Sequence, residues 1–162
     1  MQIREATLND IPSISAIIRR AHRDVAQRFG LTVENCPKHT SFCTDDWVAA
    51  DFVRGERYFL LLSDQHAIAC VAYERPNPNL AYLNRLSVLP DYRRRGIGER
   101  LVSHVIALAR ADGVSAVSIG IIGEHTHLQD WYAKLGFADG EAKRFPHLPF
   151  TVRYMSYPIA TA

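Results

Sequence analysis

One stretch of the sequence, residues 86–98, reads Leu86-Ser87-Val88-Leu89-Pro90-Asp91-Tyr92-Arg93-Arg94-Arg95-Gly96-Ile97-Gly98. It closes an apolar strand pattern that begins at Leu80 and opens a helical pattern at Ile97. The first amides of a helix have no intrahelical acceptor, so they can donate to an anion with the help of the helix dipole. Gly96 and Gly98 remove side chains that would keep a phosphate from the backbone, and arginines can add charge-assisted hydrogen bonds. The stretch therefore predicts a phosphate-binding turn.

Other interpretations of the two glycines compete with this one. An isolated Gly-x-Gly beside arginines is commonly a tight turn with a solvated basic patch. A dinucleotide-binding fingerprint needs another glycine or alanine three residues after Gly98, where the chain has Leu101, and an acidic residue about twenty positions later, which is also missing. A Walker loop needs Gly-Lys-Ser or Gly-Lys-Thr, and the sequence has neither. Both common nucleotide motifs are excluded.

The segment resembles the coenzyme A loop of the GNAT acetyltransferases, whose pattern is Arg or Gln, two residues, Gly, one residue, then Gly or Ala. Arg93, Gly96 and Gly98 match that pattern. Residues 86–92 are similar to the family strand that meets the pantetheine arm, and residues 131–137 (Trp-Tyr-Ala-Lys-Leu-Gly-Phe) are similar to the family's helix-to-strand signature. The resemblance implies an α/β fold with a mixed, mostly antiparallel sheet of about six to seven strands and about four flanking helices.

The rest of the chain fits that expectation. Thr7 and Asp10 have capping-box spacing at the start of an amphipathic helix that ends near Phe29 and Gly30, whereas residues 31–44 have neither period and predict an irregular loop. Periodicity and turn residues predict a βααβββαβαββ order. The expected strands are residues 2–6, 58–62, 67–73, 80–89, 116–122, 137–144 and 150–157, and the expected helices are 7–29, 45–54, 97–112 and 127–135. We expect residues 1–162 to form one domain.

The resemblance also assigns a donor and its contacts. It implies acetyl-CoA as cosubstrate, with the acetyl thioester between splayed central strands and no metal. The residues that would bind the coenzyme are Leu86, Ser87 and Val88 of the strand, Arg93, Arg94, Arg95, Gly96, Ile97, Gly98 and Glu99 of the loop and helix start, and His125, which stands where relatives commonly carry an asparagine. A lone loop histidine is otherwise most often solvated.

Transfer of an acetyl group to an amine needs a stabilised oxyanion and a proton for the departing thiolate. Tyr132 occupies the family's usual tyrosine position, which implies that it is the general acid. The alternative is a packed aromatic beside Trp131 with its hydroxyl bonded elsewhere. The resemblance implies that the backbone amide of Val88 stabilises the oxyanion.

The base is the weak point of the resemblance. Family members often place a glutamate on the strand before the glycine loop, but residues 82–85 read Tyr-Leu-Asn-Arg. Glu74 on the neighbouring strand, His125 or Glu124 can instead take the proton, directly or through water. Glu74 can equally be a surface residue at the end of a strand.

The acceptor pocket is expected to involve the two N-terminal helices and their loop. Phe29, Phe42 and Trp47 can line an apolar pocket, whereas Asp45 and Asp46 can attract an amine or cap the second helix. Aromatic residues at this spacing are usually packing residues. We expect direct transfer within a ternary complex to a primary amine of a small molecule, or of a peptide or protein. The alternative is an acyl-CoA-binding sensor with little turnover.

Composition limits the remaining classes. Nineteen basic and seventeen acidic residues give a formal charge of +2, which argues against nucleic-acid binding. No stretch is apolar enough to span a membrane and the first residues do not resemble a signal peptide, so we expect a cytoplasmic protein. Cys36, Cys43 and Cys70 lack the spacing of a zinc site. A homodimer paired through the final strands is compatible with the pattern.

Overall fold

A computed structural model of the chain describes residues 1–160, and its order of helices and strands is the predicted one. The elements are β1 (Gln2–Glu5), α1 (Ile11–Arg28), α2 (Asp45–Val53), β2 (Arg57–Ser63), β3 (His66–Asn77), β4 (Leu80–Val88), α3 (Ile97–Asp112), β5 (Ala116–Ile122), α4 (Thr126–Lys134), β6 (Ala138–Arg144) and β7 (Thr151–Pro158). The predicted mixed α/β fold is thereby confirmed. Within residues 1–160, no helix is long and apolar enough to cross a membrane.

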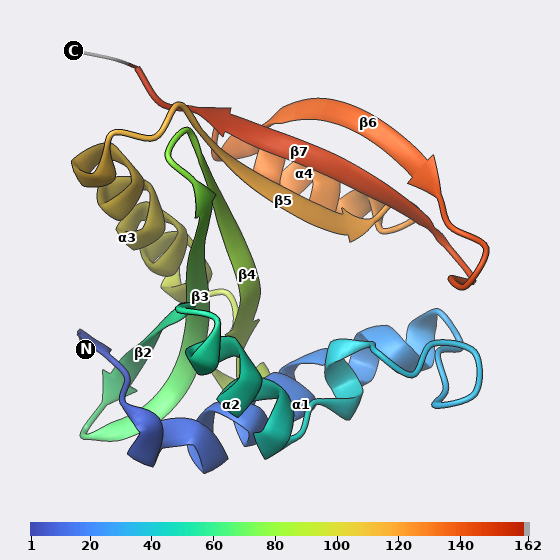
Figure 1. The fold of residues 1–162 in the computed structure, drawn as a ribbon. Helices are drawn as coiled ribbons and strands as arrows, with labels where there is room; N and C mark the ends of the chain where they lie inside the picture. The colour runs from blue at the N-terminus through green and yellow to red at the C-terminus, as the bar shows by residue number, and fades with distance from the viewer. Residues whose placement is uncertain (161–162) are drawn as a thin grey trace.

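The strands form one sheet of seven in the order β1-β2-β3-β4-β5-β7-β6. All neighbours are antiparallel except β4 and β5, which are parallel. The parallel pair is short, because only Leu80–Tyr82 of β4 face Ala116–Ser118 of β5. Beyond these residues the two strands diverge, and Figure 1 shows the opening between them. The splay that the family resemblance implied is therefore present.

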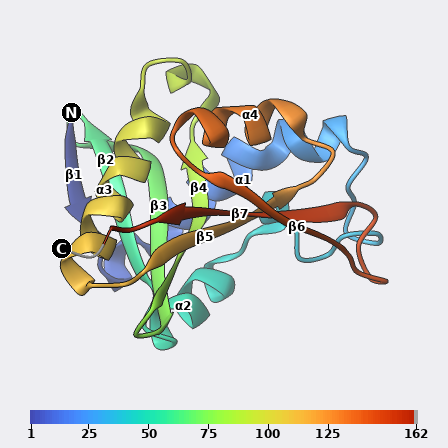
Figure 2. The same cartoon turned by 90° about the horizontal axis from the view of Figure 1, so that it is seen from above.

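Helices cover both faces of the sheet. α1 packs on β3, β4 and α2, whereas α3 packs on β2 to β5 (Figure 2). Their sequences explain this, because each helix carries buried apolar residues at three- and four-residue spacing. In α1 these include Ile14, Ile17, Ile18 and Ala21, and in α3 they include Leu101, Val105 and Ala109. Full burial of one such large side chain contributes about 1.5–3 kcal/mol, so the two helices are held mainly by packing.

The structure corrects two details of the helix starts. Residues 8–10 form a 3-10 turn before α1, in which the backbone amide of Thr7 donates to Asp10 Oδ2 at 2.8 Å. Thr44, and neither of the predicted Asp45 and Asp46, caps α2. Its backbone is extended and its hydroxyl accepts from the amide of Trp47 at 3.3 Å. The two aspartates lie in the first turn, where they complement the helix dipole.

The ends of several elements also differ from the expectation. β3 extends to Asn77, four residues past its predicted end at residue 73, because Asn77 pairs with Leu80 across the turn to β4. A short 3-10 helix, Thr40–Phe42, lies inside the loop of residues 31–44. Gly136 follows α4 with a positive φ of 108°, a conformation that favours glycine at the end of a helix.

A β-bulge lies in β4 at the point where the opening begins. Cys70 of β3 faces Ser87 and Ala72 faces Asn84, so β4 holds one extra residue between these pairs. Arg85 has φ 54°, a conformation that costs a non-glycine residue on the order of 1 kcal/mol or more. Its Nε donates to Asp51 Oδ2 at 2.9 Å, which ties the bulge to α2. The extra residue places Asn84 and Ser87 on the same face of the sheet, the face covered by α1 and α2.

Candidate active site

The predicted phosphate-binding turn has a row of unpaired amides. The backbone amides of residues 94–99 donate to no acceptor in the part of the chain that the structure describes, and the first bond of α3 runs from Arg100 N to Gly96 O at 3.1 Å. Arg94 (φ 63°) and Gly96 (φ 74°) are both left-handed, which curves the backbone into a concave turn. With the positive end of the α3 dipole, this geometry suits a phosphate or pyrophosphate.

Gly98 lies where α3 meets α4. A Cβ at this position would be 3.3 Å from the indole ring of Trp131 and 3.9 Å from a methyl group of Val88. The first turn of α3, the end of β4 and α4 therefore meet at one place. A side chain on residue 98 would occupy the space beside the unpaired amides.

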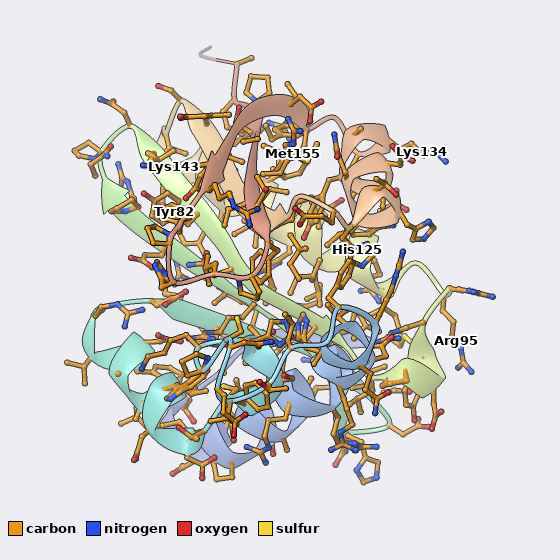
Figure 3. All side chains as sticks on the ribbon, turned by 90° about the vertical axis from the view of Figure 1, so that its right-hand side faces the viewer. Tyr82, Arg95, His125, Lys134, Lys143 and Met155 are labelled. Carbon is orange, nitrogen blue, oxygen red and sulfur yellow. The ribbon has the colours of Figure 1, made fainter. Side chains whose placement is uncertain are left out.

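The three consecutive arginines have different roles. The guanidinium of Arg93 pairs with Asp24 Oδ2 at 2.7 Å and donates to the carbonyl of Ala21 at 2.6 Å, so it fastens the turn to α1. Arg94 and Arg95 are exposed, and Figure 3 shows Arg95 at the edge of the molecule. The guanidinium of Arg95 lies over the ring of Tyr92, 5.3 Å from its centre. The side chains of Arg94 and Arg95 are thus available to an anion, whereas the guanidinium of Arg93 is paired with Asp24 and its backbone amide donates to Pro90 O at 3.3 Å.

The strand residues predicted to meet the pantetheine arm border the opening. Leu89 N donates to Ile68 O at 3.0 Å. In an antiparallel pair, adjacent residues of a strand direct their amides to opposite sides. The amide of Val88 is therefore directed away from β3, toward the opening. His22 of α1 lies 3.2 Å from the carbonyl oxygen of Leu86 and 3.0 Å from Ser87 Oγ through its Nε2. Leu86 and Ser87 are thereby fixed against α1.

His22 makes folding stability depend on pH. Burial is the largest cause that lowers its pKa to about 4, with His39 adding to the shift and the Leu86 carbonyl opposing it. Between pH 6.5 and 4 the unfolded chain binds more protons at this group, so stability falls as pH falls. We expect about 2 kcal/mol of the free energy of unfolding to be lost through His22 between about pH 7 and 5. Urea unfolding of wild type and His22→Gln tests this, and an equal pH dependence in both would contradict it.

Tyr132 is buried at 4% exposure and faces the rings of Trp131 and Phe137 edge-on. No group within residues 1–160 hydrogen-bonds the Tyr132 hydroxyl. The alternative interpretation, in which another protein group binds this hydroxyl, therefore has no support among the described residues. Burial raises the pKa of Tyr132, which keeps the phenol in its protonated form. The side chain can therefore donate a hydrogen bond or a proton, as a general acid must.

His125 and Glu124 are both occupied by structural contacts. Nδ1 of His125 accepts from the amide of Leu128 at 3.3 Å and caps α4, and its ring packs on Phe29 at 5.6 Å between centroids. Burial lowers the pKa of His125, which leaves a neutral ring with Nε2 as the remaining polar atom. Glu124 accepts from the amide of Thr151 at 3.0 Å. Figure 3 shows His125 between α4 and the end of α1.

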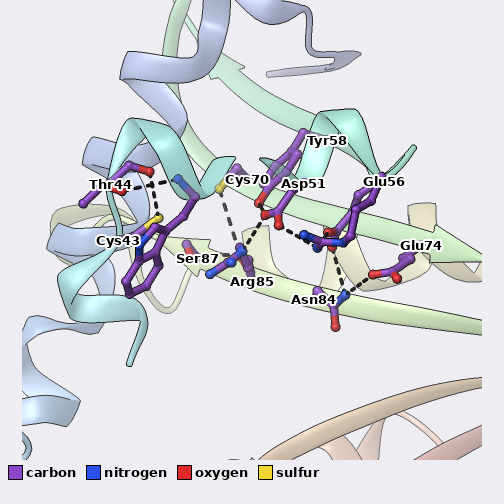
Figure 4. Close-up of polar contacts among 12 residues, drawn as sticks. Cys43, Thr44, Asp51, Glu56, Tyr58, Cys70, Glu74, Asn84, Arg85 and Ser87 are labelled. Atoms are coloured by element: carbon purple, nitrogen blue, oxygen red, sulfur yellow. Dashed lines mark hydrogen bonds and ion pairs between the residues drawn. The ribbon is translucent and has the colours of Figure 1, made fainter. Parts of the chain in front are cut away.

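Glu74, the other candidate base, belongs to a polar cluster under α2 (Figure 4). Nδ2 of Asn84 donates to Glu74 Oε2 at 3.3 Å and to Glu56 Oε1 at 2.9 Å. Asp51 accepts from Tyr58, Arg85 and Arg54 at 2.5, 2.9 and 2.7 Å. His125 is not part of this cluster, so the predicted candidates for the base occupy two different places.

The sequence analysis missed Glu56, Asp51, Arg85 and His22. A signal existed for Asp51, because it lies three residues after the buried Val48 and so on an apolar face of α2. The sequence also carried a signal for Arg85, because it is a charged residue within a largely apolar strand. Glu56 and His22 gave no local signal, because their partners are distant in the chain.

The predicted substrate residues do not meet in one pocket. Phe29 belongs to a small apolar cluster with Leu31 and Cys36, next to His125. Phe42 lines an open pocket of about 450 Å³. Lys38 Nζ and Arg85 Cζ each lie over the ring of Trp47, at 5.5 and 5.9 Å from its centre. Within the described residues, no group of three or more acidic, histidine or cysteine side chains is arranged to hold a metal ion.

Comparison with known proteins agrees with this geometry. The family model described as acetyltransferase (GNAT) family matches residues 18–137 of the chain. An amino-acid acetyltransferase from Pectobacterium atrosepticum is 27% identical over 146 residues, which cover 90% of this chain and 29% of that protein. The chain thus spans less than a third of the length of the curated relatives it matches.

Solved structures share the fold. The ribosomal-protein-S18-alanine N-acetyltransferase from Escherichia coli has a TM-score of 0.79 at 21% identity, covering 99% of this chain and 95% of that chain. The PaiA N-acetyltransferase from Thermoplasma acidophilum, in complex with coenzyme A, has a TM-score of 0.78 at 15% identity, covering 98% of each chain. A family match over most of the chain, the splayed sheet and the turn of unpaired amides lead to one conclusion: the chain belongs to the acetyltransferase (GNAT) family.

Proposed function

We propose that residues 1–162 act as one domain that binds acetyl-CoA and transfers its acetyl group to a primary amine of a small molecule. The observation that carries this proposal is the row of unpaired amides at residues 94–99, at the positive end of α3. Gly96 and Gly98 leave that backbone open to the coenzyme's pyrophosphate, and Arg94 and Arg95 add positive charge at its edge. The pantetheine arm then runs along Leu86, Ser87 and Val88 into the opening between β4 and β5.

The chemistry follows from the groups at that opening. The amide of Val88 stabilises the oxyanion that forms when the amine attacks the thioester carbonyl. Tyr132 donates a proton to the departing thiolate. Transfer is direct, because a covalent acetyl-enzyme would need an activated nucleophile. The thiols are poor candidates for that role, since burial raises the pKa of Cys36, Cys43 and Cys70, that of Cys70 to about 12.

An amino acid is the first small-molecule acceptor to test, since the curated relatives are named amino-acid acetyltransferases. A second candidate acceptor is the amine of a peptide or protein. It is favoured by the fold shared with the ribosomal-protein-S18-alanine N-acetyltransferase. An α-amino group has a pKa of about 7.7–8.0 and a lysine side chain about 10.4, so the former offers more neutral nucleophile at neutral pH.

Location and assembly form part of the same proposal. The three cysteines are unpaired and buried, as in proteins of a reducing compartment, which supports the cytoplasm. β6 is an exposed edge strand along its whole length, and it can pair with a second copy in a homodimer. We expect no nucleic-acid partner, because the charge is nearly balanced.

Release of coenzyme A, measured with a panel of amino acids, other small amines and short peptides, tests the proposal. We expect turnover with at least one small amine and saturable acetyl-CoA binding by titration calorimetry. Tight acetyl-CoA binding without turnover on any amine would favour the acyl-CoA sensor. Absence of acetyl-CoA binding would contradict both.

A further inference from the structure

Asn84 occupies a special place in β4. It follows Tyr82, the last β4 residue that pairs with β5, by two positions, and it directly precedes the bulge at Arg85. It is partly exposed. Asn84 therefore stands at the inner end of the opening in which the thioester is proposed to lie.

Two carboxylates fix the orientation of the Asn84 amide. Glu56 Oε1 lies 2.9 Å and Glu74 Oε2 lies 3.3 Å from Nδ2 of Asn84. Ionised carboxylates only accept hydrogen bonds, so the amide must present its NH₂ group to them. Oδ1 consequently points away from the pair, and no group within residues 1–160 donates to it. Figure 4 shows the amide oxygen on the side of Asn84 opposite Glu56 and Glu74.

The cluster behind Asn84 carries one more negative charge than positive. Asp51 is satisfied by Arg54, Arg85 and Tyr58, and Glu56 Oε2 accepts from Arg54 at 3.0 Å. Within residues 1–160, the Glu74 carboxylate hydrogen-bonds only Asn84, and Glu74 is partly exposed. The charged groups of the cluster are the carboxylates of Asp51, Glu56 and Glu74 and the guanidinium groups of Arg54 and Arg85. An excess negative charge at this depth favours a cation over a neutral ligand.

Glu56 is the carboxylate of this cluster whose pKa is raised. Burial is the largest cause that raises the pKa of Glu56, and Asp51 and Glu74 add to the rise. The Asn84 hydrogen bond and Arg85 oppose it. Glu56 thus takes up a proton at a higher pH than a solvated glutamate would.

From this geometry we propose that Asn84 Oδ1 receives the acceptor ammonium and that Glu74, on the other side of the amide, takes its proton through a bridging water, while Glu56 holds the Asn84 amide in the receptive orientation. The inference rests on the proposed function and names the groups that bind the amine and take its proton. Asn84 and Glu74 are then catalytic residues, and Glu56 is a positioning residue that acts through Asn84.

The step balances as follows. One N–H proton of the ammonium moves through the bridging water to the Glu74 carboxylate, and the nitrogen lone pair forms the C–N bond with the thioester carbonyl carbon. The C–S bond breaks with its electron pair on sulfur, and Tyr132 supplies the proton that makes the free thiol. A second N–H proton leaves as the amide forms and restores the Tyr132 hydroxyl through solvent, while Glu74 returns its proton to water.

Asn84→Leu removes the amide at nearly constant volume and tests the amine contact. We expect kcat/KM for the amine to fall about 10- to 100-fold, the range spanned by one hydrogen bond to a charged group, with acetyl-CoA affinity unchanged. Asn79→Leu, an exposed position at the β3–β4 turn, is the matched control and should retain wild-type activity. Wild-type kcat/KM in Asn84→Leu would overturn the inference, whereas a wild type without turnover would overturn the proposed function.

Glu74→Gln and Glu56→Gln separate chemistry from folding. For an amine of pKa about 10 assayed near pH 8, we expect Glu74→Gln to lower kcat about 100-fold, and this loss should shrink at least tenfold for an amine of pKa below about 8, which is already largely neutral. Glu56→Gln should raise KM for the amine more than it lowers kcat. Glu56→Asp, which keeps the carboxylate, should show a smaller increase in KM than Glu56→Gln. Glu141→Gln on exposed β6 is the control. Equal losses across the amine series would show a merely structural role and overturn the assignment.

Discussion

Replacement of Tyr132 by phenylalanine is expected to lower kcat about 100- to 1,000-fold without changing acetyl-CoA affinity. The hydroxyl is the single group removed, and a positioned general acid contributes about 10²- to 10⁴-fold to a rate. Because no protein group in the described residues bonds that hydroxyl and the ring keeps its contacts with Trp131 and Phe137, the fold should be unaffected. Steady-state release of coenzyme A and titration calorimetry give the two quantities.

Tyr92→Phe is the matched control, because it removes the hydroxyl of a partly buried tyrosine that lies outside α4. It should leave kcat within about twofold of wild type, as expected for a change that removes no group from the transition state. Melting temperatures of both variants establish that they are folded. Full activity in Tyr132→Phe would remove the assignment of the general acid, whatever the base proves to be.

Replacement of Gly98 by valine is expected to weaken acetyl-CoA binding at least tenfold. The new Cβ would lie 3.3 Å from the Trp131 ring, and its methyl groups would extend over the unpaired amides of the first turn of α3. A pyrophosphate held by several backbone donors loses them together when its approach is blocked, and each charge-assisted bond contributes about 1.5–3 kcal/mol. Titration calorimetry with acetyl-CoA measures the effect.

Ala107→Val controls for the lower helix propensity of valine, since Ala107 is exposed on the same helix. It should bind acetyl-CoA as wild type does. Gly98→Ala should fall between the two, because Trp131 need move only a few tenths of an ångström. Wild-type affinity in Gly98→Val would place the pyrophosphate elsewhere on the molecule.

The parts of the fold that the sequence predicted depend on local patterns. Apolar periodicity gave the order of the elements, and the glycines at 96 and 98 with residues 131–137 gave the family resemblance. Gly136 has the positive φ expected of a glycine at a helix stop. The sequence offers Asp45 or Asp46 as possible caps of α2, whereas Thr44 is the cap, because all three residue types can cap and the choice depends on where the helix begins.

The parts that the sequence could not predict depend on distant contacts. The opening between β4 and β5 leaves no trace in the alternation of either strand. The bulge at Arg85 is tied to α2 by Asp51, 34 positions away, which accepts a hydrogen bond from the Arg85 guanidinium. Glu56 and Glu74 meet only through Asn84, and Arg93 is turned toward Asp24 of α1. The coenzyme turn is thus readable from neighbouring residues, whereas the groups proposed to handle the amine are assembled by the tertiary fold.

A crystal structure of the chain with acetyl-CoA tests the central claim most directly. It should place pyrophosphate oxygens about 3 Å from backbone amides of residues 94–99, the distance of an N–H···O bond, with the thioester between β4 and β5 and its sulfur within reach of the Tyr132 hydroxyl. A pyrophosphate bound away from that turn, or a thioester outside the opening, would contradict the account.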